Sequence, residues 1–186
     1  FTASEDIQIT TADVNILGGN VPILAVTGSD LRGWSAESRA VVASDPSGTV
    51  TFSIDFKDLA GNAGTQIVST TTGDTVVIDR TSATASPISM YSNNTSSTLA
   101  KVGDIVYLEF ELDEIFSGWA ATLAGNNVNP SNISNIATDT YRLNYTMTSS
   151  DPEGPIAFTL LVTDTANNVS PIYTAVTSGT EVVFDR

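Results

Sequence analysis

Cysteine and histidine are both absent from this chain of 186 residues. Without cysteine there are neither disulfides nor thiolate metal ligands, and the count says nothing about the redox compartment. Without histidine the usual general base and every histidine-dependent triad are excluded. Acidic pairs such as Asp113-Glu114 are present, but no motif places a second acid opposite them for glycoside hydrolysis. We therefore expect no enzymatic activity.

Basic residues and long hydrophobic runs are also scarce. Seven Lys and Arg stand against 21 Asp and Glu, which gives a formal net charge of -14. Such a chain repels nucleic acid and anionic lipid, and it has no basic cluster to follow a phosphate backbone. No apolar run approaches the length of a membrane span, and no signal peptide is visible. We expect no nucleic-acid binding and no membrane insertion in this segment; its carboxylates form a solvated exterior or collect divalent cations.

The chain does contain an internal repeat. Residues 47–80 align with residues 153–186 without a gap, which pairs Asp58 with Asp164 and Asn62 with Asn168. A spacing of roughly a hundred residues indicates one domain per repeat rather than a solenoid of small units. We place the two domains at residues 1–82 and 83–186.

Short strands separated by Gly, Asn and Asp turns fill both repeats. Residues 34–43 and 140–148 are predicted strands, and the second alternates apolar and polar side chains with the period of two that half-buried strands show. The clearest strand of each repeat follows an Asp-Pro-x-Gly turn. Its predicted core positions are Val50, Phe52, Ile54 and Phe56 in the first repeat and Ile156, Phe158, Leu160 and Val162 in the second. With no amphipathic helix in view, the pattern indicates an all-β chain of two antiparallel β-sandwiches.

The first repeat starts late. Residues 1–7 correspond to the segment from Phe110 to Ile115, which in the second repeat follows a full predicted strand. We expect the first domain to lack its N-terminal strands, about two dozen residues, and so to expose an apolar groove and unpaired sheet edges. A neighbouring chain that fills this groove by strand addition would build a filament or a surface layer. This self-association is one alternative function.

Four motifs of the first repeat together resemble the bacterial immunoglobulin-like repeats of giant surface adhesins and biofilm-associated proteins. They are Phe-x-Ala-Ser-Glu from Phe1, Gly-x-Val-x-Phe-x-Ile from Gly48, Asp-x-Ala-Gly-Asn from Asp58 and Val-x-Ile-Asp from Val76. The second repeat departs from them at Asn167, where the motif prefers glycine, and at Leu112-Asp113-Glu114. The resemblance implies tandem immunoglobulin-like modules in an extracellular spacer of a cell-surface adhesin, with neighbouring modules as its partners.

In that family, acidic residues at module junctions hold calcium and stiffen the rod. The topology of such a sandwich points to the same place, because the loop after the second strand and the loop before the last strand lie where the chain enters. Hard oxygen ligands from both loops and the linker suit Ca²⁺. In the second domain the expected ligands are Asp79, Asp113, Glu114, Asp164 and Asn168. The corresponding half-site of the first domain would use Glu5, Asp6, Asp58 and Asn62.

Simpler roles exist for the same residues. Asp58 and Asp164 are also suited to opening a turn by accepting backbone amide hydrogen bonds, with Asn62 or Asn168 in a left-handed position. Trp34 and Trp119 are candidate platforms for a sugar ring in a glycan- or protein-binding module, although a single aromatic in a sandwich is more often core. Five asparagines match the N-x-S/T glycosylation pattern, of which Asn144 is expected to be the most accessible: Asn93, Asn94, Asn132, Asn144 and Asn168.

Overall fold

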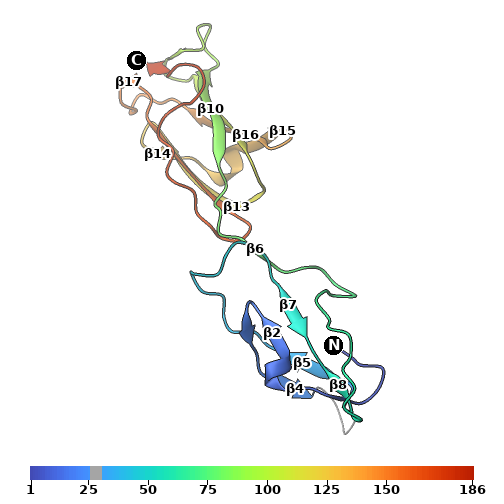
Figure 1. Ribbon diagram of the computed structural model, residues 1–186. Coiled ribbons are helices and arrows are strands. Elements are labelled where there is room, and N and C mark those ends of the chain that lie inside the picture. Colours follow the sequence, from blue (N-terminus) through green and yellow to red (C-terminus); the bar gives the residue numbers. More distant parts are fainter. Residues whose placement is uncertain (26–30) are drawn as a thin grey trace. The chain divides into compact units, whose positions relative to one another are not determined.

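The computed structural model describes residues 1–25 and 31–186, and their architecture is all-β. The chain divides into two compact units, Phe1–Asp79 and Arg80–Arg186 (Figure 1). Helical structure in the described residues is limited to the three-residue 3-10 turns η1 (Thr11–Asp13) and η2 (Pro130–Asn132). Within this described part, no helix has the length and apolarity that crossing a membrane requires.

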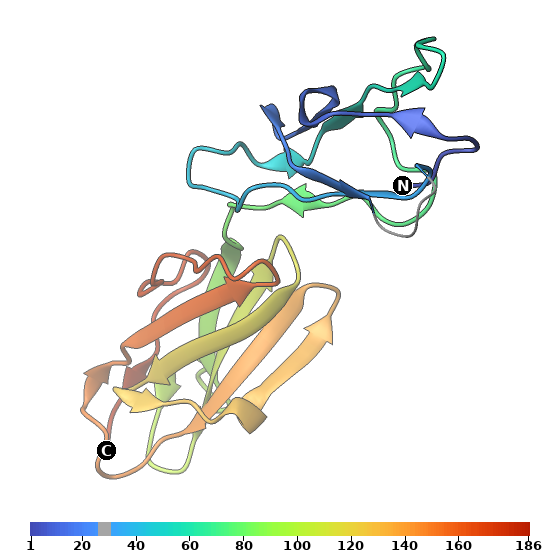
Figure 2. The same ribbon diagram turned by 90° about the horizontal axis from the view of Figure 1, so that it is seen from below.

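The second unit has a sandwich-like arrangement of sheets. One antiparallel sheet has the strand order β10-β12-β16-β15, and a second has the order β14-β13-β18. Figure 2 shows the strands β13 and β18 lying over the first sheet. A small third sheet pairs β19 with β17 and, in parallel, with β11. The strands are β10 (Ala85–Ser92), β11 (Leu99–Ala100), β12 (Ile105–Leu112), β13 (Phe116–Leu123), β14 (Asn126–Asn127), β15 (Ile133–Ala137), β16 (Thr140–Thr146), β17 (Gly154–Pro155), β18 (Phe158–Asp164) and β19 (Val183–Phe184).

Alternating side chains of these strands form one continuous core. Every second residue of β12 and β18 is buried, as the period-two pattern predicts. Facing positions on β10 and β16 complete the cluster. The buried strand residues include Ile88, Met90, Val106, Leu108, Phe110, Leu112, Leu143, Phe158, Leu160 and Val162.

The first unit has shorter strands and a much smaller core. Its described pairings form a three-stranded sheet of the order β3-β2-β7 and the separate pairs β1-β8, β4-β5 and β6-β9. The core cluster consists of Val14, Val21 and Ile54. The strands are β1 (Ile7–Gln8), β2 (Val14–Ile16), β3 (Gly19–Asn20), β4 (Ile23–Ala25), β5 (Trp34–Ala36), β6 (Gly48–Thr49), β7 (Phe52–Ile54), β8 (Lys57–Asp58) and β9 (Val77–Ile78).

The sequence repeat is also a structural repeat. Ile54 of β7 lies opposite Val14, and the aligned Leu160 of β18 lies opposite Ala121. The aligned glycines Gly73 and Gly179 have φ angles of 87° and 80°, in the left-handed region that glycine adopts without strain. Positions separated by 106 residues in this part of the chain are therefore structurally equivalent.

The predicted strand at residues 34–43 is wrong in length, because β5 ends at Ala36 whereas its counterpart β16 continues to Thr146. In the second unit β16 is paired on one side with β12 and on the other with β15. In the first unit β5 pairs with β4, and on its other side only Trp34 exchanges backbone hydrogen bonds with Phe1. Among the described residues of the first unit, no strand takes the place beside β5 that β12 has beside β16.

Candidate functional site

The chain enters the second unit between two loops. The Asn168 side chain, in the loop after β18, donates a hydrogen bond to the Thr81 carbonyl at 3.3 Å. In the loop after β12, the Asp113 carboxylate accepts from the Thr84 amide at 2.7 Å, and the Asp113 amide donates to the Thr84 carbonyl at 3.2 Å. The entering segment and both loops therefore meet, as the topology predicts.

Asp164 is the most deeply buried acidic residue of this region, with an exposed fraction of 0%. The Asn168 amide donates to one of its carboxylate oxygens at 2.8 Å, and the Asn168 side chain donates to the other at 2.9 Å. Burial by itself raises the pKa of Asp164, but these bonds and those from the Ala166 and Asn167 amides together lower the pKa below its ordinary value. Asp164 is thus a buried carboxylate that keeps its charge.

A second carboxylate adjoins Asp164. One oxygen of Glu114 and one oxygen of Asp164 lie within 4.8 Å of each other. Two ionised carboxylates at this separation repel each other, and a cation between them removes that cost. The set of oxygen donors, with Asp113 adjacent to Glu114, matches the preference of calcium for carboxylates and carbonyls. Asp79 is the last residue of the first unit and directly precedes Arg80.

The corresponding residues of the first unit have other partners. Asp58 accepts hydrogen bonds from the Asn62 amide at 2.8 Å and from its side chain at 2.7 Å, and the side-chain bond is the main cause that lowers the pKa of Asp58. Asp6 forms an ion pair with Arg32 at 2.9 Å. Within the described residues, Glu5, Asp6 and Asp58 do not gather closely enough to share an ion. The predicted turn hydrogen bonds are therefore present in both units. The predicted left-handed position of Asn62 and Asn168 is wrong, because the preceding residues Gly61 and Asn167 have the positive φ angles, 91° and 68°.

The tryptophans are half-buried rather than exposed platforms. The Trp34 indole nitrogen donates to the Leu31 carbonyl at 3.1 Å, and Trp119 packs against the core of the second unit. These environments fit structural roles; Trp119 also lines a surface pocket with Thr122 and Asn127, and the sugar-platform role stays a prediction.

The asparagines of the glycosylation pattern are engaged in hydrogen bonds. Between η2 and β16, the Asn144 side chain donates to the Asn132 carbonyl and the Asn132 side chain donates to the Asn144 carbonyl, at 3.2 and 3.3 Å. The Asn93 side chain accepts from the Ile105 amide. Asn144 is half-buried, so it is less accessible than its position on a polar face suggests.

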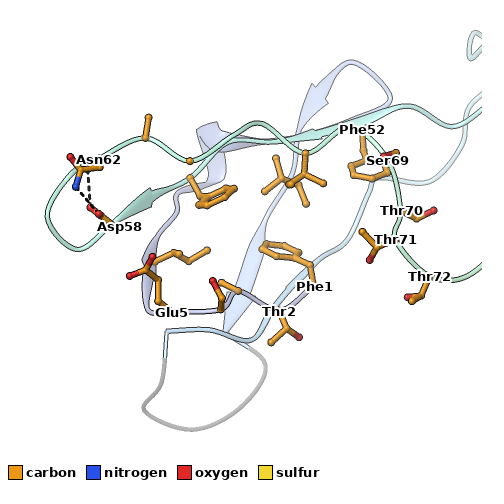
Figure 3. A pocket seen from close by; sticks show the side chains of 18 residues that line it. Phe1, Thr2, Glu5, Phe52, Asp58, Asn62, Ser69, Thr70, Thr71 and Thr72 are labelled. Carbon is orange, nitrogen blue, oxygen red and sulfur yellow. Dashed lines mark hydrogen bonds between the residues drawn. The ribbon is translucent and has the colours of Figure 1, made fainter.

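A groove of about 900 Å³ opens in the first unit (Figure 3). Its apolar lining includes Phe1, Phe52, Phe56 and Ile67, and one side is formed by the row Ser69–Thr72. The apolar groove is expected from the late start of the repeat, but the row of hydroxyl residues is not. The row could have been found in the sequence, because the repeat aligns Thr71 with Thr177 and Thr72 with Ser178, so both copies carry hydroxyl residues at these positions.

Comparisons with known protein families, with curated proteins and with solved structures found no match to this chain. The fold and the repeat define its class as an acidic, all-β chain of two compact units built largely from antiparallel strand pairs. Any finer assignment rests on the residues described above.

Proposed function

We propose that this chain is an extracellular spacer from a bacterial cell-surface adhesin, built from tandem immunoglobulin-like modules whose junction is stiffened by calcium. The observation that carries the proposal is that two acidic loops form hydrogen bonds with the segment that enters the second unit. Asp113 and Asn168 bond this segment on either side, and Glu114 and Asp164 place two carboxylates beside it. In this proposal Asp79 supplies a further carboxylate from the first unit.

A spacer needs repeated modules, solubility and a defined angle between modules, and it needs no catalytic group. The repeat and the net charge of -14 meet the first two requirements. The defined angle comes from an ion bound by residues before and after Arg80, because such an ion restricts the backbone torsions of the linker. If the dissociation constant were about 1 mM in about 1 mM calcium, binding would add only roughly 0.4 kcal/mol to stability. The useful effect is therefore rigidity of the junction rather than stability of either module.

Glu114→Gln is expected to weaken calcium binding by at least about tenfold, because it removes a charged ligand while keeping the size of the side chain. Terbium luminescence and calorimetric titration measure the affinity. In the parent chain, calcium should also make the two units tumble together in ¹⁵N relaxation measurements, and a chelator should reverse this.

Glu181→Gln is the matched control, since Glu181 is an exposed acidic residue of the same unit outside both loops. It should bind calcium as the parent chain does. Equal affinities in the parent, Glu114→Gln and Glu181→Gln would contradict the junction site. Relaxation that is identical with calcium and with chelator would contradict the stiffening role even if an ion binds.

A further inference from the structure

A surface pocket of about 420 Å³ lies on the sheet that β13, β14 and β18 form in the second unit. Thr159 and Leu161 of β18 line it, and they alternate with the buried residues Phe158, Leu160 and Val162. The pocket therefore lies on the face of the sheet that is turned away from the core. Its volume is within the range of small-molecule sites. None of the described residues that line it is charged, although the chain has a net charge of -14.

The first unit has polar side chains where this pocket is apolar. The gapless repeat aligns Leu161 with Asp55 and Ile172 with Gln66. Each pair lies on neighbouring segments that an equivalent backbone bridge joins in the two units. In the first unit the Gln66 side chain donates to both oxygens of the Asp55 carboxylate at 3.0 Å. In the second unit two aliphatic side chains stand at these positions.

A third position shows the same difference. Ala120 of β13 pairs with Leu161, and in the first unit the Asp55 amide donates to the carbonyl of Asp13 at 2.8 Å, so Asp13 takes the place of Ala120. Ile172 is 62% exposed, although a glutamine at the equivalent position suits the same fold. Apolar surface that faces water contributes nothing to folding. The fold does not require this apolar lining, and a ligand that covers it accounts for it.

Polar groups that can still form hydrogen bonds belong to the same lining. The hydroxyls of Thr122 and Thr159 bond each other at 2.8 Å, which leaves one hydroxyl hydrogen and several lone pairs available. Within the described part of the chain, the Asn127 side chain and the Trp119 indole nitrogen form no hydrogen bond, in contrast to the Trp34 nitrogen. No polar side-chain atom there is both buried and unpaired, so these groups contact solvent.

We propose that this pocket binds one ring of a neutral saccharide. The apolar C–H face of the ring covers Ala120, Leu161 and Ile172, and hydroxyls at the ring edge bond Asn127 and Thr122. The ligand is uncharged, because no side chain of the lining would pair with an anion or a cation. This binding activity goes beyond the spacer role, and no residue of the pocket belongs to the acidic loops at the junction.

The test titrates the intact, ¹⁵N-labelled chain with four neutral saccharides, the methyl glycosides of glucose, galactose and mannose and N-acetylglucosamine. At least one should cause saturable chemical-shift changes at the pocket residues, with a dissociation constant of about 1–10 mM, as expected for a ligand of one ring. Glucuronic acid, which is anionic, should bind at least about tenfold more weakly. The affinity should be equal in calcium and in chelator, so a failure of the calcium junction and a failure of this pocket are observed separately.

Ile172→Gln introduces the residue of the first unit and removes an exposed apolar contact. It should weaken saccharide binding about fivefold and leave the melting temperature unchanged. Thr122→Val keeps the shape of the side chain but removes its hydroxyl, and it should weaken binding about five- to tenfold. Ile136→Gln is the matched control, since Ile136 is an exposed isoleucine of β15 outside the pocket. It should leave the affinity unchanged.

Several results would overturn the proposal. These are no saturable shift change with any of the four saccharides, equal affinities in the parent chain and Ile172→Gln, or tighter binding of glucuronic acid than of the neutral rings. If the shifts of the pocket residues change with protein concentration in the absence of saccharide, a second copy of the chain covers the apolar lining and the saccharide site is wrong.

Discussion

Leu160→Ala is expected to lower the free energy of unfolding of the second unit by about 3–4 kcal/mol and its melting temperature by about 15 °C. Leu160 lies in the middle of β18 with an exposed fraction of 0%, and it packs in the continuous core of that unit. Its truncation leaves a cavity that surrounding strands cannot close, since β18 is paired with β13. Differential scanning calorimetry of the whole chain measures the loss in the transition of the second unit.

Ile54→Ala is the matched variant at the equivalent position of the first unit. Ile54 is 8% exposed and adjoins the open groove, so fewer packed atoms are lost when it is truncated. We expect a smaller cost, about 1–2 kcal/mol. Equal losses at the two positions would contradict the conclusion that the core of the first unit is incompletely covered.

Asp164→Ala is expected to lower the melting temperature of the second unit by on the order of 10 °C and to abolish calcium binding at the junction. The substitution removes the acceptor for both the amide and the side chain of Asn168 in a region where water cannot replace it. The loop from Asp164 to Asn168 then loses its hold on Thr81. Calorimetry reports the first effect, and terbium luminescence the second.

Asp58→Ala removes the same two hydrogen bonds in the first unit, where the aspartate is half-buried. Its effect on melting should be clearly smaller, because solvent satisfies the amides that it leaves unpaired. An equal or larger loss of melting temperature in Asp58→Ala would show that burial does not determine how much this turn contributes to stability.

The pH dependence of Asp164→Asn provides an independent check. Because the folded pKa of Asp164 is lowered, its ionised form contributes stability that is present above the ordinary carboxyl pKa of about 3.9 and is lost as the pH falls through the lowered value. The stability difference between the parent chain and Asp164→Asn should therefore shrink in acid. A stability difference that stays constant down to the most acidic conditions would contradict the lowered pKa of Asp164.

Much of the architecture could be predicted because it depends on local pattern. The alternation along residues 156–162 identifies Phe158, Leu160 and Val162 as one face of a strand, and all three are core residues. The Asp-to-Asn turn forms the same hydrogen bonds in both copies, because a carboxylate four residues before an amide satisfies them within a single loop.

Other features depend on contacts between segments that are distant in sequence. Residues 37–43 have the composition of a strand but do not form one, because the partner that β12 provides to β16 has no counterpart beside β5. Asp58 and Asp164 are equivalent by sequence and share a turn, yet Asp164 is fully buried and lies near Glu114, whereas Asp58 is half-buried. Burial is the sum of contacts from separate loops and strands, so local sequence specifies the turn, and tertiary packing sets its solvent exposure and the charges around it.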